Sequence, residues 1–490
     1  MSDELDQVSP VGWHRLLIEP RRPAGIRDRP GAYWLAVAAV CIGAFMGQLD
    51  ASIVTVALPT LQHTFHSSVG AVTWVGLSYL LVLVATVTAV GRFADMWGRK
   101  LLYVYGFGVF IMGSALCGLA PSLGALIGFR ALQALGAALL QANSVAIIVL
   151  AVPRASLGKA IGIQGAAQAI GLALGPSVGG LLLGAGGWRL IFLVNVPFGI
   201  IGMIAGLLFV PRSRHLQERV SFDWIGLSLF FPAVAALISA ISFGNSSGWT
   251  SPAILVLIVG GLALSACFVR RERRDDHPML DLGLFHSRRF TAGITSGLLS
   301  YLVMFGVLFL IPFYLERSLH FSASRAGIEL MIMPLALGVA APFAGRVADR
   351  IGARPLTVGG MVIVSAGLLA MGLLRPPTPL LLVLLALVGV GSGLFTPPNN
   401  TAIMGSVPEQ QSGVASGVLN MTRGLGTALG LALTGLVFEV SGGQSFVPAD
   451  VDHAFSVTTV FLAAIALGSG LIAGSRESGT LARSVNSRVE

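Results

Sequence analysis

The sequence has little charge and few cysteines. Asp, Glu, Lys and Arg make up 11% of its 490 residues, whereas 54% are hydrophobic and the mean hydropathy is +0.83. A soluble core of this size cannot bury that much apolar surface, so the remainder must face lipid. The three cysteines, Cys41, Cys117 and Cys267, lie inside apolar stretches, which excludes a disulfide framework and a C-x-x-C metal site.

Other signals are also missing. The polar N-terminal segment holds no apolar run long enough for a cleavable signal peptide, so the first span is expected to be its own insertion signal. There is no Gly-x-x-x-x-Gly-Lys loop for direct ATP drive, and no His/Asp metal cluster or nucleophile with a base, so we expect no enzyme and no bound cofactor or metal. The net charge of +9 comes from basic residues in short turns, which indicates membrane topology rather than nucleic-acid binding.

The apolar runs have the length of membrane helices. A bilayer core of ~30 Å requires ~20 apolar residues per helix, and a window of that length predicts fourteen spans. With a cytoplasmic N-terminus, 25 of the 31 Lys and Arg residues fall on the cytoplasmic side, and the even number of spans places both termini there. The sequence therefore predicts an all-α, multi-pass membrane protein. The expected spans lie near 33–58, 72–92, 101–120, 123–146, 158–183, 190–210, 223–243, 253–270, 290–315, 325–346, 355–374, 380–404, 412–440 and 455–474.

An internal repeat predicts the domain organisation. The turn from Gly91 to Lys100 has a second copy from Gly345 to Arg354, and a Val-Pro pair followed by four glycines also occurs twice at nearly the same offset. Two six-span halves, 33–210 and 290–474, are therefore expected to be duplicates. The linker 211–289 carries two further helices as an inserted hairpin, between an N-tail of residues 1–32 and a C-tail of residues 475–490. Parallel repeats of six spans are typical of alternating-access carriers.

Several motifs follow one another in a fixed order. They are Leu49 to Pro59 in span one, the two repeated turns, Arg130 to Gln133 in span four, Gly171 to Gly180 in span five, and Trp188 to Gly199 at the start of span six. In this order they resemble the fourteen-span drug:proton antiporters of the major facilitator superfamily, the EmrB/QacA type, over essentially the whole chain. One departure is Ala134, where that family usually carries glycine.

The resemblance implies a fold and a function. The fold is the major facilitator fold, with two six-helix bundles and two extra linker spans. The function is export of hydrophobic or cationic small molecules by alternating access, coupled to protons, in the bacterial inner membrane. The implied partners are an amphipathic small molecule, protons and the bilayer, with the proton gradient as energy source and the monomer as functional unit.

Two charged residues lie deep in predicted spans. Asp50 lies about 17 residues into span one and Arg130 about seven into span four, which enters from the opposite face, so at ~1.5 Å per residue both reach a similar depth. Ionisable groups at depth usually pair or mark an ion pathway. We expect Asp50 to bind the coupling proton and Arg130 to adjust its proton affinity. The alternative is a structural ion pair, or a helix cap by Asp50.

Span five carries a run of glycines with one proline. Glycine lets another helix approach closely, whereas proline removes a backbone donor and favours a kink. By resemblance this run is the antiporter motif, and the kink would assist the rocking motion or seal the pore against protons. Ordinary helix packing is the alternative. The residues are Gly171, Gly175, Pro176, Gly179 and Gly180.

The two repeated turns are candidates for conformational gating. An aspartate at a helix end accepts hydrogen bonds from a facing helix N-terminus and interacts with its dipole. By resemblance, Asp95 would contact span thirteen near Ser412 and Gly413, and Asp349 would contact span five near Gly158, closing the cytoplasmic side. The cations of the turns alternatively serve only to fix topology. The candidate residues are Gly91, Asp95, Gly98, Arg99, Lys100, Gly345, Asp349 and Gly352.

Polar side chains in or beside spans are candidates for the substrate cavity. Glu329 lies about one turn inside span ten and is a candidate for attracting a cation, with a solvated carboxylate as the alternative. The other candidates equally suit hydrogen bonds between helices. The full set is Glu329, Asn143, Gln168, Asn399, Asn400 and Arg423.

Other carriers and membrane proteins fit the sequence less well. A sugar or metabolite symporter would be expected to lack the span-five motif and the hairpin, and a receptor or scaffold does not require Asp50 at depth. An exporter of a lipid, glycolipid or biosynthetic metabolite would use the same coupling machinery, so the sequence leaves that alternative open.

Overall fold

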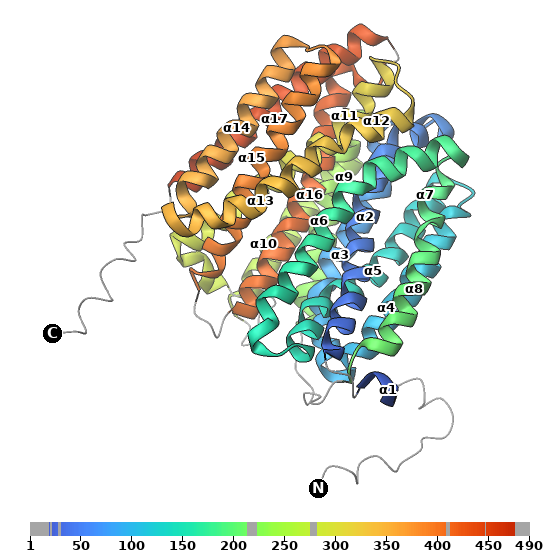
Figure 1. The fold of residues 1–490 in the computed structure, drawn as a ribbon. Helices are drawn as coiled ribbons and strands as arrows, with labels where there is room; N and C mark the ends of the chain where they lie inside the picture. Colours follow the sequence, from blue (N-terminus) through green and yellow to red (C-terminus); the bar gives the residue numbers. More distant parts are fainter. Residues whose placement is uncertain are drawn as a thin grey trace, which may run out of the picture. The chain divides into compact units, whose positions relative to one another are not determined.

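The computed structural model describes residues 19, 22–27, 31–212, 223–274, 282–407, 412–445 and 447–475 (Figure 1). These residues form helices joined by short turns, with no strand among them. Fourteen helices within this part of the chain are long and apolar enough to cross a membrane, so the predicted all-α, fourteen-span fold class is confirmed. In chain order the elements are α1 (Ala24–Arg27), α2 (Ala32–Phe65), α3 (Val69–Trp97), α4 (Arg99–Gly118), α5 (Leu123–Ala151), α6 (Arg154–Gly186), α7 (Arg189–Leu193), α8 (Asn195–Phe209), α9 (Trp224–Ser247), α10 (Pro252–Glu272), η3 (Leu282–His286), α11 (Arg288–Arg317), α12 (Ala323–Leu330), α13 (Ile332–Ile351), α14 (Ala353–Leu374), α15 (Thr378–Met404), α16 (Ser412–Phe438), η5 (Glu439–Gly443) and α17 (Pro448–Gly474).

Serine side chains mark several helix starts. Ser68 accepts a hydrogen bond from the amide of Ala71 at the start of α3, and Ser122 does the same for α5 through Ala125. A side-chain oxygen in this position satisfies one of the amides that a helix leaves without a partner in its first turn. The short polar turns therefore end one span and begin the next.

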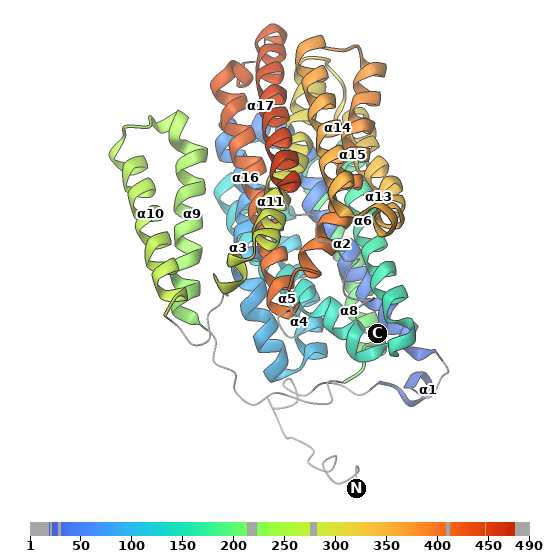
Figure 2. The same ribbon diagram turned by 90° about the vertical axis from the view of Figure 1, so that its left-hand side faces the viewer.

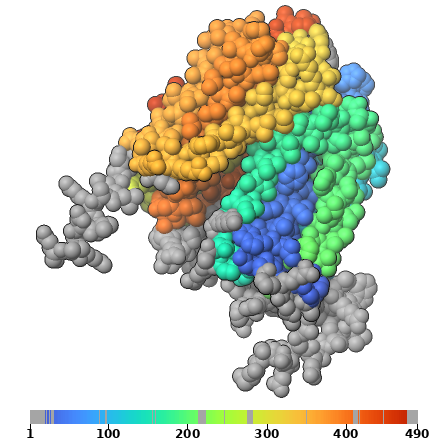
Figure 3. Space-filling model, in the orientation of Figure 1, coloured from blue at the N-terminus to red at the C-terminus, as the bar shows by residue number. Residues whose placement is uncertain are grey.

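The contacts divide the chain into two units, Met1–Met279 with Phe321–Met331, and Leu280–His320 with Ile332–Glu490. In the first unit, α2 packs against α6 and α8, and α5 packs against α3 and α4. In the space-filling view the blue surface of α2 lies between the teal α6 and the green α8 (Figure 3). The short helix α12 also belongs to this unit, where it packs against α6.

The hairpin of α9 and α10 is attached to the first unit through α3 (Figure 2). Two aromatic contacts join α9 to α3: Trp74 stacks on Phe243 at a centroid distance of 6.1 Å, and Phe93 contacts Trp224 at 5.3 Å. The outer helix α10 packs mainly on α9 and exposes large apolar side chains, such as Val256 and Val259. An apolar helix with so few protein neighbours is suited to a lipid environment.

In the second unit, α11 packs against α16 and α17, and α15 packs against α13 and α14. Tyr314 of α11 stacks on Phe455 of α17, with ring centroids 3.8 Å apart. Predicted span ten is formed by two helices, α12 and α13, separated at Met331. Helix α12 thus clusters with the first unit and α13 with the second.

Candidate functional site

The centre of the first unit holds a buried ion pair. Nη1 of Arg130 on α5 donates to Oδ2 of Asp50 on α2 at 2.7 Å. The two side chains are 1% and 0% exposed. The structure therefore brings together the two residues that the sequence placed at a similar depth.

Three further side chains complete a buried network around this pair. The second carboxylate oxygen of Asp50 accepts hydrogen bonds from Nε2 of Gln133 at 3.0 Å and from Nδ2 of Asn195 at 2.8 Å. Oγ of Ser114 accepts from the same two amides, at 2.9 and 3.2 Å. Gln133 also accepts from Nη1 of Arg130 at 2.7 Å. Helices α2, α4, α5 and α8 thus each contribute to the network of Asp50, Ser114, Arg130, Gln133 and Asn195.

The guanidinium of Arg130 is held on its remaining sides. Its Nε donates to the carbonyl oxygen of Val75 on α3 at 3.1 Å. Its central carbon lies 4.2 Å from the ring centroid of Tyr79 and 5.7 Å from that of Phe192. Burying two charges is costly unless geometry and hydrogen bonds are both good, and this network supplies both.

Sequence reasoning missed four members of this site. Gln133 and Asn195 lie in motifs of spans four and six, but neither was assigned a role from the sequence. Ser114 and Tyr79 carry no signal of their own, because serine and tyrosine are ordinary in membrane helices. Only the distances show that all four contact the ion pair or its partners.

The glycines of α6 lie directly against α2. A Cβ added to Gly171 would overlap the carbonyl oxygen of Phe45, and one added to Gly175 would overlap Oγ of Ser52. Gly179 faces Ile53 in the same way. The glycines of this motif thus form a close packing surface of α6 against α2, the helix that carries Asp50.

The other side of this motif contacts α12. Oγ of Ser324 donates to the carbonyl oxygen of Gly180 at 2.8 Å, and a Cβ on Gly327 would overlap the carbonyl oxygen of Pro176. Helix α6 continues through Pro176 from Arg154 to Gly186. In the second unit, Gly426 and Gly430 of α16 have a similar role, since added Cβ atoms would overlap backbone oxygens of α11.

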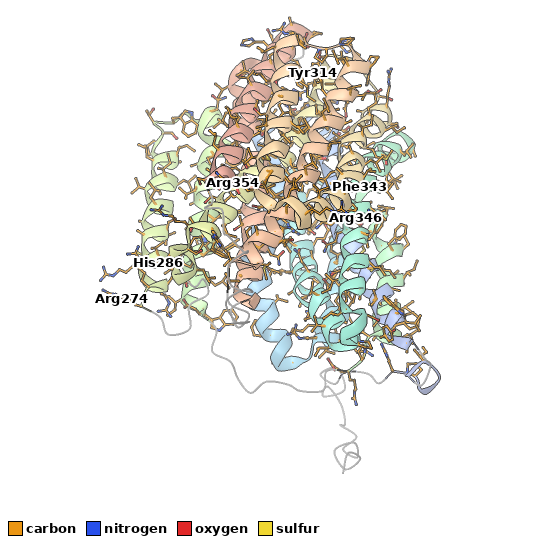
Figure 4. All side chains as sticks on the ribbon, turned by 60° about the vertical axis from the view of Figure 1, so that its left-hand side comes forward. Arg274, His286, Tyr314, Phe343, Arg346 and Arg354 are labelled. Atoms are coloured by element: carbon orange, nitrogen blue, oxygen red, sulfur yellow. The ribbon has the colours of Figure 1, made fainter. Side chains whose placement is uncertain are left out.

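The repeated turns show why two of their glycines are required. Gly98 and Gly352 end α3 and α13 with φ of +105° and +85°, which favour glycine. Gly91 and Gly345 lie in more open surroundings. In the second turn, Arg346 lies over the ring of Phe343 at 5.7 Å (Figure 4).

The proposed contacts of the turn aspartates lie outside the described side chains. This applies to Asp95 and Asp349 and to their expected targets Ser412, Gly413 and Gly158. Arg99 and Lys100 begin α4, and Lys100 is fully buried. A role in topology alone does not require burial of this lysine.

A short N-terminal segment is bound to the first turn. The carboxylate of Glu19 accepts hydrogen bonds from the backbone amides of Lys100 at 3.0 Å and Leu101 at 3.4 Å, so it caps α4. Nε of Arg212 donates to the carbonyl oxygen of Glu19, and Nε of Arg22 donates to that of Phe209, both at 2.6 Å. Burial lowers the pKa of Arg22 below its ordinary value. Nothing in the sequence pattern predicted this segment, which ties α4 to the end of α8.

Among the candidate cavity residues, one acid and two amides make hydrogen bonds. Oε1 of Glu329 accepts from Nε of Arg325 at 2.9 Å, whereas its Oε2 is buried without a hydrogen-bond partner among the described residues. Nδ2 of Asn399 donates to the carbonyl oxygen of Gly293 at 3.2 Å. Nδ2 of Asn143 donates to Leu139 at 2.8 Å, and its oxygen has no partner among the described residues.

The other three candidates are half-buried. They are Gln168, Asn400 and Arg423. Arg423 lies 5.2 Å above the ring of Tyr301, and its Nε is buried without a partner among the described residues. Within the described part of the chain, no three His, Cys, Asp or Glu residues are grouped so that they could hold a metal ion.

Fourteen apolar helices within the described residues, together with a buried charge pair in the first unit, are typical of a multi-pass membrane transporter. The chain belongs to the Major Facilitator Superfamily, whose family model matches residues 40–224 and 293–482. It is therefore a transporter and not an enzyme, as the sequence predicted.

Individual relatives and one solved structure agree with this assignment. The riboflavin transporter RibZ of Clostridioides difficile is 36% identical over 83% of this chain and 89% of its own length. The multidrug resistance protein Stp of Mycobacterium tuberculosis is 36% identical over 82% of this chain and 75% of its own length. A bacterial homologue of the human lysosomal transporter Spinster shares the fold, with a TM-score of 0.67 at 17% identity, over 91% of this chain and 98% of that one.

Proposed function

We propose that this protein is a proton-coupled exporter of hydrophobic or cationic small molecules, of the fourteen-span drug:proton antiporter type. The buried pair of Asp50 and Arg130 is the observation that carries the proposal. A carboxylate at this depth costs several kcal/mol unless it is paired, and ionisable groups in spans are typical of proton pathways. The relative Stp, named as a multidrug resistance protein, supports the choice of cargo.

The network suggests how protonation changes the molecule. While Asp50 is charged, it accepts from Arg130, Gln133 and Asn195, and together these contacts hold α2, α5 and α8 in one arrangement. A proton on Asp50 removes the negative charge and leaves Arg130 buried without its counter-ion. Such a state is strongly unfavourable, so protonation favours a different packing of these helices. Because α2 also carries the contact surface for α6, a shift of α2 is transmitted to the antiporter motif.

We further propose the setting in which this occurs. The protein lies in the bacterial inner membrane with both termini in the cytoplasm, and it acts as a monomer. The proton gradient supplies the energy without a cofactor, and the partners are protons, the bilayer and an amphipathic small molecule, not nucleic acid. The distribution of Lys and Arg between the turns supports this orientation.

The test is efflux from energised cells that express the protein, with ethidium as a cationic probe and fluorescein as an anionic one. We expect at least one probe to be exported, and its efflux to stop with a protonophore and with Asp50→Asn. The substitution removes the charge but keeps the shape and two hydrogen-bonding atoms. Efflux that survives both treatments would contradict proton coupling.

A second candidate function uses the same machinery. Export of a lipid, a glycolipid or a biosynthetic metabolite is favoured by the relative RibZ, which is named as a riboflavin transporter. Absence of efflux for both probes, from a folded protein at normal abundance, would favour this candidate over drug export.

A further inference from the structure

Charged residues are rare in the middle of the membrane helices. In the helices that the structure describes, only three Asp, Glu, Lys or Arg residues lie seven or more positions from both ends: Asp50 on α2, Arg130 on α5 and Arg423 on α16. The first two neutralise each other at 2.7 Å in the first unit. Arg423 belongs to the second unit.

Arg423 has no acidic partner among the described residues. Its Nε is buried and makes no hydrogen bond, although the side chain as a whole is only half-buried. Helix α16 contains no Asp or Glu, and the only acid of the neighbouring α11 is Glu316. That acid lies 15 positions from Tyr301, or about 22 Å along the helix.

Arg130 and Arg423, the two arginines in the middle of their helices, share one feature and differ in another. Arg130 lies over Tyr79 and contacts a carboxylate, whereas Arg423 lies over Tyr301 without one. A ring face stabilises a guanidinium only in part, and it leaves the planar edge with its donors available. That edge matches a carboxylate in two-point geometry.

The position of Arg423 is fixed by its helix. Gly426 and Gly430 allow the backbone of α16 to contact α11 closely, and the side chain of Tyr301 fills the space beside Gly426. The repeat aligns Arg423 with Gln168, because each residue lies three positions before the first glycine of its helix contact. The second half therefore carries a charge where the first half has a neutral amide.

We propose that Arg423, together with Tyr301, binds an acidic group of the cargo, so that the transported molecules are amphipathic anions. This inference rests on the proposed proton-coupled export, and it replaces the cationic part of the proposed cargo class with hydrophobic molecules that carry an acidic group. The acidic group of such a molecule, a carboxylate or a phenolate, supplies the missing counter-ion, and its rings contact the tyrosine. Among the described residues, the acids Asp50 and Glu329 are each already paired with an arginine.

The test is equilibrium binding of two dyes to the purified full-length protein in nanodiscs, without a proton gradient. Fluorescein and rhodamine 123 share a xanthene ring system, but the first is an anion and the second a cation. We expect saturable binding of fluorescein, weakened about tenfold or more by Arg423→Gln and less by Arg423→Lys, which keeps the charge without the planar fork. Rhodamine 123 binding is expected to stay constant or to strengthen in Arg423→Gln.

Arg375→Gln is the matched control, because it removes an exposed arginine at the end of α14 and is expected to leave both affinities unchanged. Fluorescein that does not bind the folded wild type, or that binds Arg423→Gln equally well, would overturn the assignment. Asp50→Asn separates the two proposals. If it keeps coupled transport while fluorescein still requires Arg423, the proposed proton role fails and the anion site stands.

Discussion

At the scale of single residues, the network of Asp50 shows how a membrane helix tolerates two charges. Three donors reach the carboxylate, and the guanidinium has a carbonyl oxygen, an amide oxygen and an aromatic face besides its counter-ion. Removing one partner is more harmful than removing both, because the remaining charge stays buried.

The first prediction compares single and double substitutions of this pair. Arg130→Ala leaves Asp50 buried without its cation and should destabilise the protein by about 3–5 kcal/mol. Adding Asp50→Asn removes the stranded charge and should recover part of the loss. Thermal unfolding of the purified variants measures both effects. A double variant whose loss equals the sum of the two single losses would show that the pair is not coupled.

At the scale of the helix, the glycines of α6 offer a test with an internal control. Gly175→Ala places a methyl group against Ser52 and must displace α2 or α6, so we expect a loss of about 1–3 kcal/mol. Gly165 lies on the same helix, and nothing lies near its added Cβ. Gly165→Ala should therefore be neutral or slightly stabilising. Equal melting temperatures for the two variants would contradict close packing at Gly175.

The proline of the antiporter motif gives a second prediction at this scale. Pro176 contacts α12 through its carbonyl oxygen, next to the hydrogen bond from Ser324 to Gly180. If this region seals the pore against protons, Pro176→Ala should increase passive proton entry into proteoliposomes that contain no cargo. The leak is followed with a pH-sensitive dye in the lumen. An unchanged leak would leave the motif with a packing role only.

The cap that Glu19 forms at the start of α4 gives a further prediction at the scale of the helix. Glu19→Ala removes the acceptor for the amides of Lys100 and Leu101, so loss of this cap should cost about 1 kcal/mol. Hydrogen exchange of those two amides should become faster. Glu19→Gln keeps an oxygen acceptor and should retain most of the protection. Slow exchange in Glu19→Ala would mean that another group caps α4.

Most of the helices could be predicted from the sequence, because the length of a hydrophobic run is enough to identify a membrane span. All fourteen spans correspond to predicted ones, and the matched depth of Asp50 and Arg130 anticipated their contact. The partners Ser114 and Asn195 were not predictable, since they depend on how α4 and α8 are rotated against α2. Glu19 was missed for another reason: a polar segment has no periodicity that would show what it contacts.

At the scale of the whole molecule, the repeat explains where the two halves agree and where they differ. Each half has a small-residue contact between a pair of helices, α2 with α6 and α11 with α16. In the first half, the glycine run of α6 contains Pro176 and the facing helix α2 carries the buried Asp50, whereas the glycine run of α16 contains no proline and the only acid of α11, Glu316, lies near its end. In the second half, the mid-helix arginine Arg423 has no acidic partner among the described residues. Under the two proposals, proton binding belongs to the first half and recognition of an acidic cargo group to the second.

The measurement that tests the account most directly is proton exchange by the purified protein in proteoliposomes loaded with an exported dye. With wild type, an imposed pH gradient should drive dye movement and dye should drive proton movement in the opposite direction. In Asp50→Asn both couplings should disappear, while exchange of dye for dye at equal pH continues, because that exchange needs no proton. Proton-driven dye movement that persists in Asp50→Asn would contradict the central role of the buried carboxylate.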